Sequence, residues 1–114
     1  MLNQVVLVGR LTSDPEAVEL EGGHKKSIFN VAVPRTYKNS NGEYETDFIR
    51  CVLWDAIASS TAEYCHKGDI VGIKGRIQVT QYEDGKEKKY LSEVVAEKVT
   101  FLSSKKENKE KTDE

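Results

Sequence analysis

Two aromatic side chains and an arginine share one face of the segment 46–54, at a spacing that suits the binding of flat, negatively charged ligands. Successive side chains of a β-strand point to opposite sides, so Phe48, Arg50 and Trp54 lie in one row. Aromatic rings stack on unpaired bases, and basic side chains neutralise the phosphates. This row therefore predicts contacts with single-stranded nucleic acid. The alternative is that both rings are buried under a second layer of structure, as aromatic residues in strands often are.

A second strand, expected over 69–82, repeats the arrangement. One of its faces carries Lys74, Arg76 and Tyr82 among other polar residues. Closure of the sheet can bring the two rows together into one groove, and Tyr37, just before a predicted hairpin, can add a further ring. The opposite face of this strand is apolar: Val71, Ile73, Ile77 and Val79.

A β-rich fold must position these rows. Strand-like segments cover about 2–12, 27–35, 46–54, 69–82 and a last stretch that ends near residue 102. Asn41-Gly42 and Asp84-Gly85 predict hairpins. Helical spacing predicts one short helix over 55–67, with Asp55 as its cap and Gly68 at its end. The order indicates an all-β fold, a five-stranded OB-fold Greek-key barrel with one short helix between strands 3 and 4, and with Ile49, Cys51 and Leu53 in the core.

Length and charge limit the organisation of the chain. Its 114 residues suffice for one domain, expected over 1–104, and the charged stretch 105–114 has no apolar side chain and is expected to be a disordered tail. With 17 basic and 19 acidic residues the net charge is −2, so a groove for nucleic acid needs a local positive stripe. Residues 2–11 are apolar on both faces, which indicates that this strand is covered by something besides its own barrel.

Other classes of site have little support. Cys51 and Cys65 form no Cys-x-x-Cys pair, so we expect reduced thiols, no metal and no cofactor. His24 and His66 are expected at the solvent side, and neither belongs to a recognisable catalytic constellation. Carboxylates flank the strand 46–54, but turn or cap roles account for them, so we do not expect an enzyme. The chain has no membrane-length apolar run and no visible export signal, which predicts a cytoplasmic protein.

Several short motifs, in collinear order from residue 2 to about 102, resemble those of bacterial single-stranded DNA-binding proteins. The matching segments are Val5 to Thr12 with Asp14-Pro15-Glu16, Asn30 to Val33 with Arg35, Asp47-Phe48-Ile49 with Trp54, Lys67-Gly68, Gly75-Arg76-Ile77 and Glu93 to Glu97. The resemblance implies an OB-fold subunit that pairs through its first strand and assembles into a homotetramer. It also implies sequence-independent binding and protection of single-stranded DNA in replication, recombination or repair.

The resemblance places the base-stacking rings on Tyr37, Phe48, Trp54 and Tyr82. Candidate phosphate contacts are Arg10, Arg35, Arg50, Lys74, Arg76, Lys86, Lys88 and Lys89. The final ten residues hold four basic and four acidic side chains and lack the acidic, aromatic tip common in the family, so we do not expect partner recruitment by that route. An OB-fold adaptor, whose rings contact a protein in a primosome or recombination complex, is the alternative function.

Overall fold

The computed structural model describes residues 1–104, and the expected tail, 105–114, lies outside the described residues. The described part contains six β-strands, one 3-10 turn and one α-helix. In chain order these are β1 (Val5–Leu11), β2 (Val18–Glu19), η1 (Glu21–Gly23), β3 (Lys25–Lys38), β4 (Tyr44–Trp54), α1 (Asp55–Tyr64), β5 (Ile70–Asp84) and β6 (Glu87–Ser103).

The five long strands close into a barrel. Their order is β1-β5-β6-β4-β3, and β1 pairs with β3 through Arg10 opposite Ala32 and Leu11 opposite Val31. Only β4 and β6 pair in parallel among these strands. The all-β barrel is therefore confirmed. The helix follows the third long strand as expected, although the two-residue β2 makes it fall between β4 and β5 in the full count.

The inward-facing side chains of the barrel form one apolar core. Cys51 and Leu53 are fully buried, and Ile49 packs against the core, so the predicted inner face of β4 is confirmed. Both cysteines are buried free thiols, as expected. Burial raises the pKa of the Cys51 thiol to about 12, because the apolar surroundings disfavour a thiolate.

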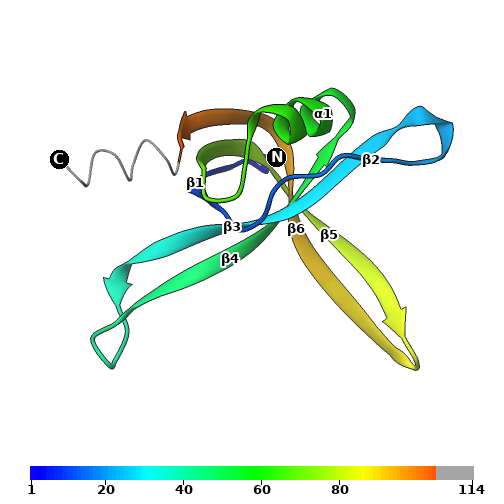
Figure 1. The fold of residues 1–114 in the computed structure, drawn as a ribbon. Helices are drawn as coiled ribbons and strands as arrows, with labels where there is room; N and C mark the ends of the chain where they lie inside the picture. Colours follow the sequence, from blue (N-terminus) through cyan, green and yellow to red (C-terminus); the bar gives the residue numbers. More distant parts are fainter. Residues whose placement is uncertain (105–114) are drawn as a thin grey trace.

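Two hairpins extend beyond the barrel. The β3–β4 and β5–β6 arms diverge on one side of the molecule, while α1 lies at the other end (Figure 1). Ile77 and Val79 share the alternation of the buried Val71 and Ile73, but they are 47% and 56% exposed because β5 has left the barrel by that point. The strand departs where its register with β6 shifts, between Lys74 and Gly75.

The helix boundaries differ from those expected. The Asp55 side chain does not cap the helix: the residue stands at the start of α1 with left-handed backbone, φ 51°, and no side chain caps the helix. Its carboxylate instead accepts hydrogen bonds from the Lys25 backbone N–H and the His24 ring, which ties α1 to β3. The helix ends at Tyr64, and Gly68 lies beyond it in a turn that donates its N–H to the Leu11 carbonyl. No helix within residues 1–104 is long and apolar enough to cross a membrane.

Candidate nucleic-acid interface

The register of four neighbouring strands creates one continuous surface on the outside of the barrel. Side chains that are cross-strand partners point to the same side of a sheet, so the pairs define rows. The first row joins Ile28, Val52, Val95 and Arg76 across β3, β4, β6 and β5; its two central members, Val52 and Val95, are buried, and the two at its ends are exposed. We call this surface the outer face; its other paired members are Lys26 and Trp54, Asn30 and Arg50, Ala32 and Phe48, Gln78 and Glu93, and Tyr82 and Lys89.

Three of the predicted rings lie on the outer face and are open to solvent. Phe48 is 66% exposed, Trp54 40% and Tyr82 47%, so none is buried under a second layer. Phe48 and Tyr82 lie on different arms, since β4 and β5 belong to the two hairpins that diverge in Figure 1. The rings therefore line a surface that continues from the barrel onto both arms.

Tyr37 lies on the other side of its arm. Arg35 binds the carboxylates of Asp47 and Glu45, whose parity is opposite to that of Phe48, and its guanidinium lies 6.0 Å from the centroid of the Tyr37 ring. The structure therefore does not bring Tyr37 into the row of the other three rings. It remains 63% exposed and accessible from the opposite side of the arm.

The sequence reasoning missed a ring on the outer face. Tyr44 has the parity of Phe48, is 60% exposed and lies 5.7 Å from the Lys38 ammonium. Tyr44 was not predicted as a site residue because residues 38–45 are mostly polar and contain the turn signal Asn41-Gly42, which indicates a loop. In the structure β4 already begins at Tyr44. Extending the alternation of 46–54 by one more pair of residues identifies it.

Lys26 and Ile28 belong to the outer face too, but the sequence prediction for 27–35 identified only the apolar, inward side of that strand. Lys26 is the cross-strand partner of Trp54, and Ile28 is the partner of Val52. A groove of about 330 Å³ between β2 and β3 has both side chains in its lining, together with Glu16, Val18 and Leu20.

The candidate phosphate contacts differ in their surroundings. Arg10 donates to the Gly68 carbonyl at 2.8 Å, and Arg50 donates to the Glu93 carboxylate at 3.0 Å. Lys89 pairs with Asp84 at 3.0 Å on the exposed tip of the β5–β6 arm. The other basic candidates on β5 and on the tip of this arm are exposed, and none forms an ion pair with the described residues. They are Lys74, Arg76, Lys86 and Lys88.

Arg35 is the candidate most fully occupied by protein groups. Its Nε and Nη2 bind Asp47 at 2.9 to 3.2 Å, and its Nη1 donates to Glu45 at 2.6 Å. The hydrogen bond with Asp47 and the opposite charge raise the pKa of Arg35, and the same hydrogen bond lowers the pKa of Asp47. Two carboxylates around one guanidinium leave this cluster with no net positive charge. Arg35 is therefore better suited to stabilising the β3–β4 arm and the position of the Tyr37 ring than to binding a phosphate.

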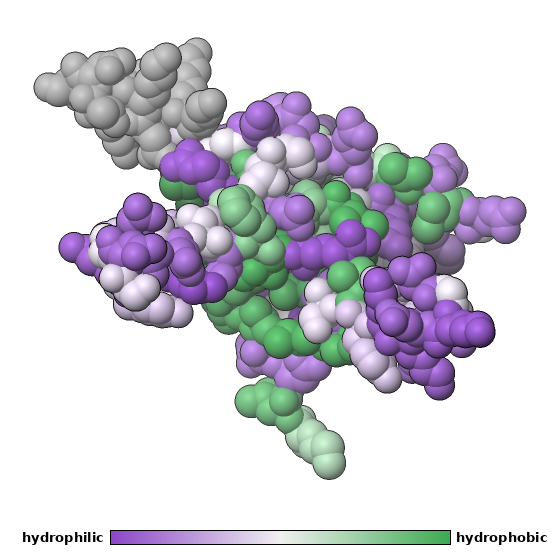
Figure 2. All heavy atoms as spheres, turned by 90° about the horizontal axis from the view of Figure 1, so that it is seen from below, coloured by the Kyte–Doolittle hydropathy of each residue, from purple (hydrophilic) through white to green (hydrophobic). Residues whose placement is uncertain are grey.

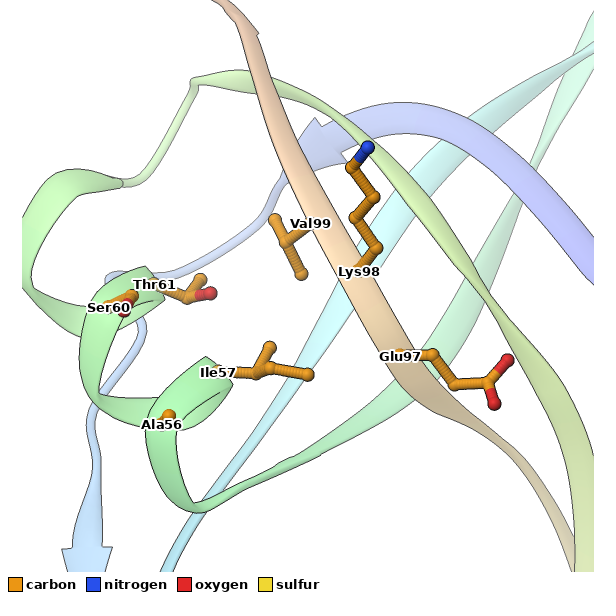
Figure 3. Close-up of a pocket in the computed structure, with 7 residues that line it drawn as sticks. All are labelled: Ala56, Ile57, Ser60, Thr61, Glu97, Lys98 and Val99. Carbon is orange, nitrogen blue, oxygen red and sulfur yellow. The ribbon is translucent and has the colours of Figure 1, made fainter.

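The other hollows of the surface contain few of the predicted residues. Figure 3 shows a shallow cavity of about 280 Å³ between α1 and β6, lined by Ile57, Thr61, Val99 and neighbouring side chains and by none of the predicted site residues. A second hollow of about 380 Å³ runs beside β1 and includes Val8 and Arg10. No group of three potential metal ligands occurs within residues 1–104.

A comparison with known families agrees with this arrangement. The sequence model of the single-strand binding protein family matches residues 2–102. The chain belongs to this family. The resemblance drawn from its motifs is therefore confirmed, and the family's description specifies binding and no reaction, in agreement with the expectation that the chain is not an enzyme.

Individual relatives within the single-strand binding protein family cover nearly the whole chain. It is 47% identical over 111 residues to single-stranded DNA-binding protein 2 of Listeria monocytogenes, a match that covers 96% of the chain and 69% of that protein. It is 44% identical over 106 residues to single-stranded DNA-binding protein B of Bacillus subtilis, a match that covers 92% of this chain and 94% of that protein. A relative from Lactiplantibacillus plantarum, 46% identical, is longer, and the match spans 54% of its length.

The fold also matches solved members of the family. A structure of the Plasmodium falciparum SSB in complex with ssDNA aligns with a TM-score of 0.80 at 25% identity, covering 90% of this chain and 96% of that one. A deletion mutant of the Thermus aquaticus single-stranded DNA binding protein aligns with a TM-score of 0.75 at 29% identity, covering 90% and 51%. These alignments confirm the OB-fold barrel.

Proposed function

We propose that this chain binds single-stranded DNA without sequence preference and protects it during replication, recombination or repair. The observation that carries the proposal is the outer face, where exposed rings and basic side chains follow one surface across four strands. The names of its relatives and the ssDNA complex of the Plasmodium protein support the same ligand. Unpaired DNA would bring the chain to the nucleoid in the cytoplasm.

Stacking on the rings supplies contacts that ignore base identity. Every base has a flat π-face, so each ring of the outer face can hold any base and contributes about 1–3 kcal/mol. We assign this role to Phe48, Trp54 and Tyr82, and to Tyr37 on the opposite side of its arm. Duplex DNA cannot use these rings, because its bases are already stacked on one another.

Basic side chains neutralise the backbone between the stacked bases. Lys74 and Arg76 lie on the outer face beside the rings. Lys86, Lys88 and Lys89 at the tip of the β5–β6 arm are further candidates, with Lys89 already paired with Asp84 and Lys88 opposite Glu83. Each neutralised phosphate releases condensed cations, so affinity should fall as salt concentration rises. Arg10, near the end of β1, can bind a further phosphate, because only one of its terminal nitrogens donates to a protein group.

We further propose that the chain assembles as a homotetramer whose dimers form through β1. Val6 and Val8 are 70% and 54% exposed on the outside of this strand, beside the hollow that runs along it. Figure 2, which views the molecule from the hairpin end, shows hydrophobic surface between two hydrophilic projections. Apolar side chains exposed in such a row are typical of a surface that another subunit covers.

The proposed binding can be tested with labelled oligonucleotides of several base compositions. Fluorescence anisotropy should give similar affinities for homopolymers and for mixed sequence, and the Phe48→Ala, Trp54→Ala double variant should bind at least tenfold more weakly. Tyr64→Ala is the matched control, because Tyr64 is 69% exposed on α1, away from the outer face. Equal affinity in the double variant and the control would contradict the proposed role of the rings.

A further inference from the structure

An ion pair in the middle of the outer face joins Arg50 on β4 to Glu93 on β6. We propose that Glu93 fixes Arg50 as a flat stacking surface for a base, so that Arg50 does not act as a phosphate contact. The inference rests on the proposed binding of single-stranded DNA and deepens it, because it assigns different roles to two arginines on the same face, Arg50 and Arg76.

The contacts of Glu93 hold its carboxylate in place from two sides. Arg50 Nε on β4 donates to Glu93 Oε2 at 3.0 Å, and the Thr80 hydroxyl on β5 lies 3.5 Å from Oε1. The Glu93 side chain is only 11% exposed, whereas that of Arg50 is 38% exposed. The carboxylate is thus largely withdrawn from water, while part of the guanidinium stays open to a ligand.

The charge of this pair is balanced within the protein. Glu93 already balances the charge of Arg50, so its carboxylate would repel a phosphate that approached the free Nη groups, and displacing Glu93 would leave a largely buried carboxylate without its partner, which is strongly unfavourable. Arg76 differs, since its Nη1 donates to the neutral Gln78 amide at 3.0 Å and no carboxylate pairs with it among the described residues. Arg76 therefore keeps a net positive charge for the backbone, and Arg50 does not.

The shape of Arg50 suits a different contact. Its guanidinium is planar and stacks on aromatic rings and bases. It shares one face of β4 with Phe48, two residues before it, and Trp54, four residues after it. Bonding through Nε to Glu93 fixes the orientation of the plane, so that Arg50 continues a row of flat groups along the strand.

Lysine substitutions separate planarity from charge. We expect Arg50→Lys to weaken binding of a labelled deoxythymidine homopolymer about fivefold or more in fluorescence anisotropy, because the flat surface is lost although the charge remains. Arg76→Lys, the matched control, should bind within about twofold of the unmodified chain, since a phosphate accepts either cation. Near-normal binding by Arg50→Lys would overturn the proposal.

The salt dependence of binding provides a second readout. Each phosphate contact on a single strand contributes about 0.7 to the slope of log affinity against log salt. Arg76→Ala should lower that slope by about 0.7, whereas the double variant Arg50→Ala, Glu93→Gln, which removes the whole neutral pair, should lower affinity and leave the slope unchanged. Equal losses of slope in both variants would identify Arg50 as a phosphate contact and overturn the inference.

The Glu93→Gln variant tests the role of the carboxylate directly. It leaves the Arg50 charge unbalanced, so the slope should become steeper by about 0.7; an unchanged slope would count against the proposal. Circular dichroism checks the fold, and the two lysine variants still decide the question if Glu93→Gln does not fold. Absence of binding by the unmodified chain would overturn the proposed function itself, whereas loss of binding in Phe48→Ala but not in Arg50→Lys would overturn only this inference.

Discussion

The ammonium of Lys26 on β3 lies 5.0 Å from the ring centroid of Trp54, its cross-strand partner on β4. A cation over an aromatic ring is attracted by about 0.5–1 kcal/mol at an exposed site. The contact orients the indole and places a positive charge beside the position where a base would stack. Lys26 thus combines the two kinds of contact that the outer face offers, although it belongs to none of the motifs that first indicated the function.

Loss of Lys26 should weaken binding in two ways. Lys26→Ala removes a charge near the stacked base and loosens the orientation of Trp54, so we expect affinity for a deoxythymidine oligomer to fall several-fold and the salt slope to decrease by about 0.7. Anisotropy titrations at three or more salt concentrations give both quantities. Lys25→Ala, one residue away on the opposite side of β3, is the control and should retain the slope. A wild-type slope in Lys26→Ala would contradict the role of this ammonium.

Tyr44 should act as an additional stacking ring near the tip of the β3–β4 arm. Its parity and 60% exposure place it on the outer face, so Tyr44→Ala should reduce affinity by about 1–3 kcal/mol for an oligomer long enough to reach the arm. A shorter oligomer that occupies only the barrel should bind both proteins equally. If Tyr44→Ala leaves binding of every length unchanged, the ring does not contact DNA.

Gly75 should be essential to the point where β5 leaves the barrel. A Cβ at this position would meet the Val95 carbonyl oxygen, and would lie 2.9 Å from the Val95 carbonyl carbon and 3.0 Å from the Ala96 Cα. These are backbone atoms that cannot rotate away, so Gly75→Ala should destabilise the fold by about 1–3 kcal/mol or more. Chemical denaturation at one fixed protein concentration measures the change.

Gly72, three residues earlier on β5, is the matched control for Gly75. Its nearest neighbour to an added Cβ is the flexible end of Leu102, at 3.7 Å, which is ordinary contact. Gly72→Ala should therefore be neutral or stabilise the fold by up to about 1 kcal/mol. Similar losses of stability at both positions would show that the close approach to Val95 is not the cause.

The Asp55 carboxylate should make stability depend on pH in the acid range. The backbone N–H of Lys25, and secondarily the His24 ring, lower the pKa of Asp55 below its usual value of about 3.9. Around that pH the unfolded chain therefore binds more protons than the folded one. The stabilisation is complete above about pH 4 and is lost as pH falls through the lower pKa of the folded state.

Denaturant titrations between pH 7 and pH 3 test this dependence. Asp55→Asn should lower stability at pH 7 and flatten its decline in acid, whereas Glu63→Gln removes the same charge from an exposed site on α1 and should retain the decline. An equally steep acid decline in Asp55→Asn would show that other carboxylates produce it.

The β1 surface should decide the oligomeric state. Val8 is 54% exposed on the outside of β1, so Val8→Glu would place a charge in the proposed interface and should lower the mass measured by light scattering. Val18→Glu, an equally exposed substitution on β2, is the control and should leave the mass unchanged. If both variants keep the mass of the unmodified chain, the subunits do not pair through β1.

Alternation along the strands predicted much of this molecule. Side chains alternate between the two faces of a strand, and closure into a barrel does not change this alternation. It therefore predicted that Cys51 and Leu53 face the core and that Phe48 and Trp54 face the solvent. Exposure of Ile77 and Val79 could not be predicted in this way, because alternation gives the face of a strand and not the point where the strand leaves the barrel.

Tyr37 has the odd parity of Phe29 and Val31, so alternation along β3 already places it opposite the face on which Ala32 pairs with Phe48. The two extra residues of β3 between Pro34 and Lys38 preserve that parity.

Long-range contacts account for the other differences. Asp55 was expected to cap its helix, but hydrogen-bond donors from a residue thirty positions away, Lys25, compete for its carboxylate. Pairing of Arg50 with Glu93 likewise depends on β4 and β6 being neighbours, which the sequence order of the strands does not show.

The most direct test of the account is a titration of the unmodified chain, followed through the emission of Trp54, its only tryptophan. A single-stranded oligomer should change the emission in a saturable way at low salt, and a duplex of the same sequence should produce little change, because its bases cannot reach the rings. Equal responses to the two ligands, or no response to the single strand, would contradict the claim that the outer face holds unpaired bases.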